Sequence, residues 1–217
     1  MAKKPIVTEQ RIILQNIDWQ KFETLVAELG VERQTRLTYF RKTLELMTPI
    51  ADHERCHKLI ESFILVLVDE LALEVTPIAS VLLKAPDLGC AIEPDACYYF
   101  RSDPALKTAS EIHLPQHNPP DLAVEIAFTK SSLDKLPIYA TLGISEVWRC
   151  NAIASKDVLQ GNLQIYHLQG DRYIESRNSL QFPFLEGDRI LQFLEQSDSI
   201  SLATALRVLR AWVEETI

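Results

Sequence analysis

At 217 residues, the chain is long enough for one domain with a substantial core, and a second independent domain would be cramped. Hydrophobic residues make up 47% and charged residues 24%, which excludes the disordered, collagen-like and coiled-coil classes. The formal net charge of −8 opposes broad, nonspecific attraction to a nucleic-acid backbone, so any nucleic-acid site must be a local basic groove.

The first predicted elements are a helix and a hairpin. Asp18 can cap a helix from about Trp19 to Leu29, because its carboxylate accepts from exposed amides of the first turn. Two β-type runs follow, Arg36 to Phe40 and Thr43 to Met47. Only Arg41-Lys42 separates them, which predicts a hairpin without the preferred Asn-Gly turn.

A long amphipathic helix is expected from about Ala51 to Leu73, packed against a sheet. Its apolar residues follow the i, i+3, i+4, i+7 spacing, and acidic residues interrupt the run, so it falls short of a membrane span. The N-terminus has no secretion signal, so we expect a cytoplasmic protein without a membrane partner. Its four cysteines are then reduced and mostly in the core.

The remainder of the chain alternates predicted strands and helices, which indicates an α/β (α+β) fold in one domain spanning residues 1–217. We place the core at about 17–195 and a C-terminal helix at about 200–215. A long irregular connection is expected from Arg101 to Pro120, a short helix from Leu133 to Leu142, and a second hairpin around Gln169-Gly170-Asp171. The predicted strands are Glu74 to Ala79, Ser80 to Lys84, Ala96 to Phe100, Leu122 to Phe128 and Glu146 to Cys150.

Alternation in the strand Leu122 to Phe128 gives one apolar face and one face that carries Asp121 and Glu125. A glutamate between Val124 and Ile126 rarely enters a core without a partner or a metal. The alternative is an edge strand with Glu125 in water. Asp121 ranks lower as a ligand, because four extended residues separate its Cα from that of Glu125 by about 13 Å.

A second acidic cluster, Glu93-Pro94-Asp95, stands at the start of the strand Ala96 to Phe100. Two adjacent strands could direct Asp95 and Glu125 to one point, and hard divalent cations such as Mg²⁺ bind one or two carboxylates. Lys135 follows shortly and could return toward them, where an ammonium group orients water or stabilises phosphate charge. The alternatives are turn chemistry for Asp95 after Pro94 and a solvated helix-surface Lys135.

These motifs, taken in order, resemble the Uma-type restriction-endonuclease-like family of the PD-(D/E)xK nuclease superfamily. The resemblance covers roughly Ile17 to Phe193 and also includes the Trp19 helix, Leu44-Glu-Leu-Met47 and His53-Glu54. The motifs that carry it are Glu93-Pro94-Asp95, Pro120-Asp121-Leu-Ala-Val-Glu125-Ile, Ser131-Ser-Leu-Asp-Lys135-Leu-Pro-Ile-Tyr139-Ala and Gly143-Ile-Ser-Glu146-Val-Trp148.

The resemblance implies a restriction-endonuclease-like mixed sheet with Asp95 and Glu125 as metal-binding carboxylates and Lys135 as the catalytic lysine. Glu54 matches a place where superfamily members carry another acid, although an acid in the first turn of a helix is also explained by the helix dipole. The sequence departs from the usual pattern at Ala127, where a lysine ordinarily stands two residues after the acidic residue. Either Lys135 replaces that lysine, or the site has lost hydrolytic power.

Several other residues are assigned to packing or to the surface. His53 is expected to be a capping or surface residue. His113 and His117 have the spacing of a zinc pair, but Pro115 between them breaks the helix that such a pair needs. We expect the larger aromatic residues to pack in the core or at an interface: Trp148, Trp212, Tyr98, Tyr99 and Tyr139.

The leading hypothesis is therefore an endonuclease that uses Mg²⁺ or Mn²⁺ to hydrolyse phosphodiester bonds in nucleic acid, with DNA favoured. Asp95 and Glu125 hold the metal, Lys135 assists catalysis, and Glu54 and Asp121 support the site. The alternative is a catalytically degenerate module on the same fold that binds nucleic acid or a protein partner, as Ala127 and the acidic net charge suggest. A homodimer with a structural role is a third hypothesis.

Overall fold

The computed structural model describes residues 8–78, 80–102, 106, 111–155 and 158–217, which form two six-stranded mixed sheets and five α-helices. The first sheet has the order β1 (Gln10–Gln15), β3 (Thr43–Thr48), β2 (Arg36–Phe40), β6 (Cys90–Ile92), β5 (Leu82–Ala85) and β8 (Glu111–His113). The second has the order β12 (Arg172–Ser176), β11 (Val158–Gln169), β10 (Glu146–Ser155), β9 (Leu122–Ala127), β7 (Ala96–Tyr99) and β4 (Thr76–Ile78).

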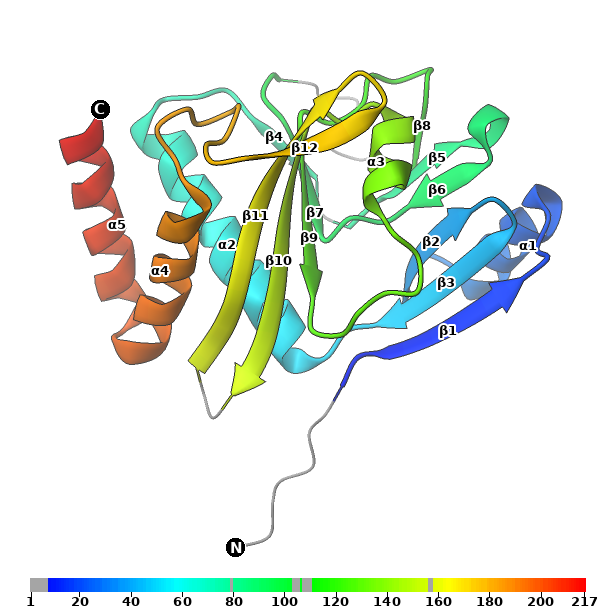
Figure 1. The fold of residues 1–217 in the computed structure, drawn as a ribbon, viewed down its shortest axis with the longest axis horizontal. Coiled ribbons are helices and arrows are strands. Elements are labelled where there is room, and N and C mark those ends of the chain that lie inside the picture. The colour runs from blue at the N-terminus through cyan, green and yellow to red at the C-terminus, as the bar shows by residue number, and fades with distance from the viewer. Residues whose placement is uncertain (1–7, 79, 103–105, 107–110, 156–157) are drawn as a thin grey trace, which may run out of the picture.

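The helices separate into layers around the second sheet (Figure 1). The long helix α2 lies with α4 and α5 on one face of that sheet, and α3 lies on the other face, toward the first sheet. The first helix packs on the first sheet. The bounds are α1 (Trp19–Leu29), α2 (Ala51–Glu70), α3 (Leu136–Leu142), α4 (Gly187–Ser199) and α5 (Leu202–Thr216), with a 3-10 turn at Pro86–Leu88.

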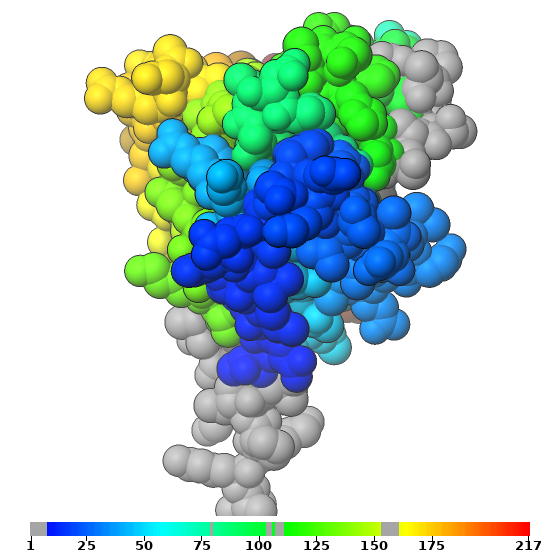
Figure 2. Space-filling model, turned by 90° about the vertical axis from the view of Figure 1, so that its right-hand side faces the viewer, coloured from blue at the N-terminus to red at the C-terminus, as the bar shows by residue number. Residues whose placement is uncertain are grey.

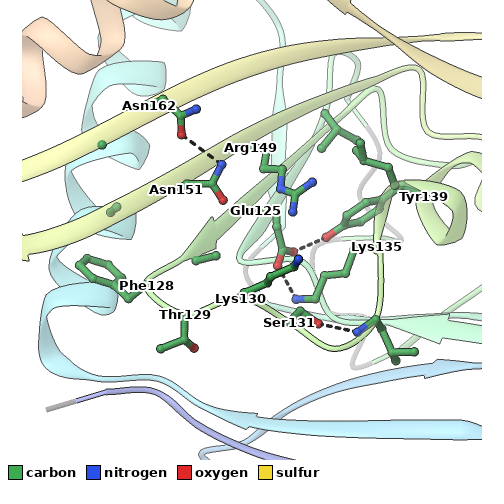
Figure 3. Close-up of a pocket in the computed structure, with 16 residues that line it drawn as sticks. Glu125, Phe128, Thr129, Lys130, Ser131, Lys135, Tyr139, Arg149, Asn151 and Asn162 are labelled. Carbon is green, nitrogen blue, oxygen red and sulfur yellow. Dashed lines mark hydrogen bonds and ion pairs between the residues drawn. The ribbon is translucent and has the colours of Figure 1, made fainter.

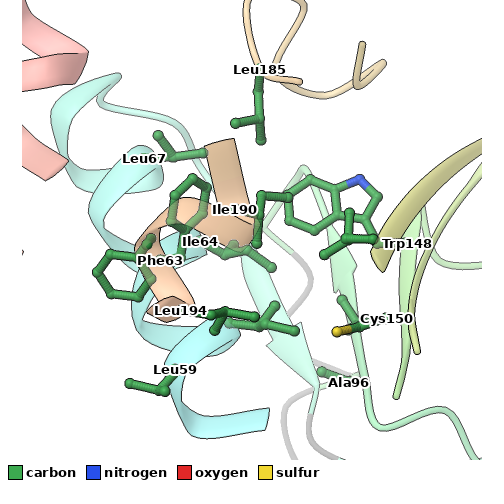
Figure 4. Packing of buried hydrophobic residues seen from close by; sticks show 14 of the residues in the cluster. Leu59, Phe63, Ile64, Leu67, Ala96, Trp148, Cys150, Leu185, Ile190 and Leu194 are labelled. Atoms are coloured by element: carbon green, nitrogen blue, oxygen red, sulfur yellow. The ribbon is translucent and has the colours of Figure 1, made fainter. Parts of the chain in front are cut away.

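The largest core cluster lies between α2, α4 and the second sheet (Figure 4). Phe63 and Ile64 of α2 are fully buried there, and the Phe63 ring meets that of Phe193 at a centroid distance of 5.4 Å. Trp148 of β10 is also fully buried, and its indole nitrogen donates to Glu146 at 2.7 Å. The predicted packing of Trp148, Tyr98, Tyr99 and Tyr139 is confirmed by their burial, whereas Trp212 is partly buried.

Strand β9 is central, because it lies between β7 and β10. It is antiparallel to β7 and parallel to β10, and the β9–α3–β10 connection is the crossover that a parallel pair requires. Most of β9 is buried, including all residues from Leu122 to Ile126, because it is paired on both edges and covered on both faces. The residues that β9 presents on its α3 face are therefore held rigidly on both sides.

The structure confirms the mixed α/β fold and differs from the predicted elements in several places. The strands form two sheets instead of one, and β1 and α4 were not predicted, although Ile190, Phe193 and Leu194 have helical spacing. The stretch Arg101 to Pro120 contains the short strand β8, which pairs with β5. Helix α2 ends at Glu70 instead of Leu73, because Ala72 adopts a positive φ of 50°.

The first hairpin is confirmed, and Arg41 and Lys42 both adopt the positive φ values that a tight two-residue turn requires. The second hairpin, β11–β12, is also confirmed. Strands β10 and β11 are much longer than expected and pair from Glu146–His167 to Ser155–Val158. In the described ranges, no helix combines the length and the apolar character that a membrane span needs.

The core packing predicts a large difference between two neighbouring residues of α2. Phe63→Ala should lower the free energy of unfolding by about 3–5 kcal/mol, because it removes a fully buried ring and leaves a cavity. Leu65→Ala should cost under about 1 kcal/mol, because Leu65 is 44% exposed on the same helix. Urea denaturation followed by circular dichroism measures both, and equal losses would contradict the assignment of this core.

Candidate active site

A pocket of about 680 Å³ lies between the β9–α3 connection and the β10–β11 hairpin (Figure 3). Its charged lining residues are three cations, Lys130, Lys135 and Arg149, and a single carboxylate, Glu125. The excess of positive charge is notable on a chain whose formal net charge is −8. The pocket is therefore a local cationic site of the kind that an acidic protein needs to bind a phosphate-containing ligand.

Glu125 lies at the floor of this pocket and is only 5% exposed. The register of β9 and β10 pairs Glu125 with Arg149, and paired residues on adjacent strands project to the same face of a sheet. The alternative of an edge strand with Glu125 in water is wrong, since β9 is flanked on both sides.

Both oxygens of Glu125 bind groups from the α3 segment. Lys135, the residue before α3, forms an ion pair with Oε1, and the Tyr139 hydroxyl donates to Oε2 at 2.7 Å. Burial raises the pKa of Tyr139 well above its ordinary value, and the nearby Glu125 charge raises it further, so the phenol stays a donor. Lys135 is buried instead of solvated.

Asp95 precedes β7 and binds the backbone on both sides of Glu125. Its amide donates to the Val124 carbonyl at 3.0 Å, and its Oδ2 accepts from the Ile126 amide at 2.6 Å. The carboxylate also contacts His53 Nε2 at 2.6 Å and forms an ion pair with Arg36. Asp95 and Glu125 thus lie on neighbouring strands, but their carboxylates have different partners, and Asp95 does not line the pocket.

Asp95 belongs to a row of seven side chains in which each acid contacts an arginine or His53, and we call this row the charge chain: Glu45, Arg11, Glu9, His53, Asp95, Arg36 and Glu54. Arg11 lies 2.7 Å from Glu45 and 2.8 Å from Glu9, and Arg36 lies 2.9 Å from Glu54. The buried acids of this row are thereby compensated by arginines and by His53, whereas an unpaired buried ion costs several kcal/mol.

His53 occupies the middle of the charge chain and is fully buried. The expectation of a capping or surface histidine is wrong, because its two ring nitrogens each contact a carboxylate at 2.6 Å, Nδ1 with Glu9 and Nε2 with Asp95. The sequence did not identify four residues as parts of the site: Glu9, Arg11, Glu45 and Arg149. It also did not identify Tyr139 as a partner of Glu125, although its position one helical turn after Lys135 is a local signal that the two side chains lie on the same side of the helix.

The two supporting acids are separated from Glu125 in different ways. Glu54 has a side chain that is 47% exposed, and it reaches Asp95 only through Arg36. Asp121 accepts from the Phe100 amide at 2.8 Å and lies 3.3 Å from Arg101, at the opposite end of β9 from Ala127. Within the described ranges, no three His, Cys, Asp or Glu side chains are grouped closely enough to hold a metal ion without other ligands.

Comparison with known proteins finds a matching family model and matching solved structures. The model of the Uma2 family, described as "Putative restriction endonuclease", matches residues 19–205. A crystal structure from Anabaena variabilis, described as "a putative nuclease belonging to DUF820", matches with a TM-score of 0.54 and 14% identity. This match covers 82% of our chain and 99% of the other, and it shows a shared fold. No curated protein matches.

The charge chain predicts a pH-dependent contribution of Glu9 to stability. Burial alone would raise the pKa of Glu9, but hydrogen bonds from His53 and Thr129 and the Arg11 charge outweigh it and lower the pKa from 4.5 to about 2. A pKa lowered by folding contributes stability above the unfolded value, which is lost as pH falls toward the folded value. Glu9 should therefore contribute about 2 kcal/mol more at pH 6 than at pH 3.

Urea denaturation at both pH values checks this contribution. The wild type should lose more stability on acidification than Glu9→Gln, which has no titrating group at this position. Glu74→Gln, at an exposed site after α2, should keep the wild-type slope. Identical slopes for wild type and Glu9→Gln would show that the Glu9 carboxylate is not held in its ionised form.

Proposed function

The chain belongs to the Uma2 family, and from this premise we propose that it hydrolyses phosphodiester bonds in nucleic acid with Mg²⁺ or Mn²⁺ as cofactor. One observation carries the proposal: the buried Glu125–Lys135 pair lies at the floor of a pocket that also holds Arg149 and Lys130. DNA is the favoured substrate, as the description of the family suggests.

The chemistry of the donors fits a hard divalent cation. Mg²⁺ commonly binds one or two protein carboxylates and completes its shell with water and substrate phosphate, so a cluster of three protein ligands is not required. An ionised carboxylate has about four acceptor positions. Asp95 uses three of them, for Ile126, His53 and Arg36, and Glu125 uses two, for Lys135 and Tyr139. Glu125, which lines the pocket, would hold the cation with its two remaining positions, and Asp95, whose carboxylate lies outside the pocket lining, would reach that cation with its one remaining position.

When bound, the cation supplies positive charge that polarises the phosphate and lowers the pKa of water. Lys135 keeps an ammonium group beside Glu125, where it stabilises negative charge on the phosphate or orients the attacking water. Tyr139 fixes the second oxygen of Glu125. In the balanced reaction, water adds to phosphorus, the P–O ester bond breaks, and the leaving oxygen receives a proton.

The two remaining cations of the pocket serve substrate binding in this proposal. Arg149 lies beside Glu125 on the neighbouring strand, and Lys130 is exposed on the β9–α3 connection. A guanidinium can bind two phosphate oxygens at once, and a lysine at the rim attracts the charged backbone from solution. Both contribute to binding the phosphate, whereas Glu125 and Lys135 act at the reacting atoms.

Glu125→Gln tests the assigned role. The substitution preserves size and the contact with Tyr139 but removes the charge, so divalent-ion-dependent cleavage should fall at least about 100-fold. Circular dichroism establishes that the variant is folded, and gel electrophoresis of DNA and RNA substrates measures cleavage. Glu215→Gln, exposed on α5, is the matched control and should cleave like the wild type. Full activity of folded Glu125→Gln would rule out this role.

A second candidate function is a noncatalytic module that binds nucleic acid or a protein partner. Ala127 favours it, because this pocket residue occupies the position where the superfamily pattern has its lysine. Calorimetric titration with Mn²⁺, followed by incubation with single- and double-stranded DNA and RNA, separates the two functions. Metal or nucleic-acid binding without cleavage supports the module, whereas cleavage that requires Mn²⁺ supports the nuclease.

A further inference from the structure

Glu9, just before β1, is 5% exposed and binds more groups than either proposed metal ligand. It contacts His53 Nδ1 at 2.6 Å and Arg11 at 2.8 Å. It also accepts from the Thr129 amide at 3.0 Å, the Thr129 hydroxyl at 2.7 Å and the Phe128 amide at 3.3 Å. Glu9 therefore connects α2 with the segment that directly follows β9.

The contact with His53 fixes the ring that binds Asp95. An imidazole rotates about its bond to Cβ, so its orientation depends on what holds each nitrogen. Glu9 holds Nδ1, and this leaves Nε2 directed at Asp95 Oδ1. The two contacts, each 2.6 Å long, hold the imidazole from both sides and leave it one orientation between the two carboxylates.

The contacts with Phe128 and Thr129 hold one wall of the pocket. These two residues line the pocket and follow Glu125 by three and four positions. Arg11 strengthens the connection, since its Nε donates to the Thr129 hydroxyl at 3.1 Å. Figure 2 shows the N-terminal segment (dark blue) at the surface of the molecule. Glu9 and Arg11 thus contact the pocket wall at Phe128 and Thr129, and Glu9 also contacts His53, which binds Asp95.

We propose that Glu9 is a positioning residue of the site: it orients Asp95 through His53 and holds the pocket wall at Phe128 and Thr129. Glu9 precedes the residues that match the family model, which begin at position 19. The proposal rests on the proposed function, because Asp95 needs positioning only if it binds the cation. Groups that orient a metal ligand from outside typically change metal affinity about 10- to 100-fold when they are replaced.

The test compares wild type, Glu9→Gln and the exposed-site control Glu74→Gln by two measurements. The first is the ¹H–¹⁵N resonance of the Ile126 amide in metal-free protein, which reports the position of Asp95 because that amide donates to Asp95 Oδ2. The second is the Kd for Mn²⁺ by calorimetry at pH 7. We expect Glu9→Gln to shift the Ile126 resonance upfield and to weaken Mn²⁺ binding about 10-fold or more, whereas Glu74→Gln changes neither.

An unchanged Ile126 resonance in folded Glu9→Gln overturns the proposal, as does a shifted resonance with unchanged Mn²⁺ affinity. If wild-type protein binds no Mn²⁺, the proposed function fails instead, and the Ile126 resonance alone still decides whether Glu9 positions Asp95. Thr129→Val covers the case in which Glu9→Gln does not fold. It removes one donor to Glu9 and keeps every charge, so a smaller change of the same sign is expected, and no change overturns the proposal.

Discussion

The charge chain is the constraint on which the site depends. A buried carboxylate is tolerated only when a cation or hydrogen-bond donor compensates it, and several kcal/mol are lost when one partner of a buried pair is removed. Glu9, Asp95 and Glu125 each meet this condition with partners from different elements: β1, α2, β2 and the start of α3. The acids therefore link elements that lie far apart in the chain.

The fold and the site are connected through β9. Its α2 face contributes Val124 and Ile126 to the largest core, and its other face carries Glu125 into the cationic pocket. The packing of Val124 and Ile126 on one face of β9 thus fixes the position of Glu125 on the other face. Membership of the Uma2 family and this arrangement support the proposed nuclease function, and the Anabaena variabilis structure shares the fold.

Local patterns explain which features were predictable from the sequence. The spacing of apolar residues predicted α2, and alternation predicted β9 with Glu125 on its polar face, because both signals lie within one element. The approach of Lys135 to Glu125 followed from the short connection between β9 and α3. The role of Glu9 and the burial of His53 had no such signal, since they depend on contacts between residues far apart in the chain.

The hydrogen bond between Glu9 and the Thr129 amide joins residues 120 positions apart, and this separation has a consequence for synthesis. Chains grow from the N-terminus, and elements that need distant partners stay unpaired until those partners emerge. The Glu9 carboxylate thus leaves the ribosome long before Phe128 and Thr129 exist. The contacts that join Glu9 to the pocket wall can form only after more than half of the polypeptide has been translated.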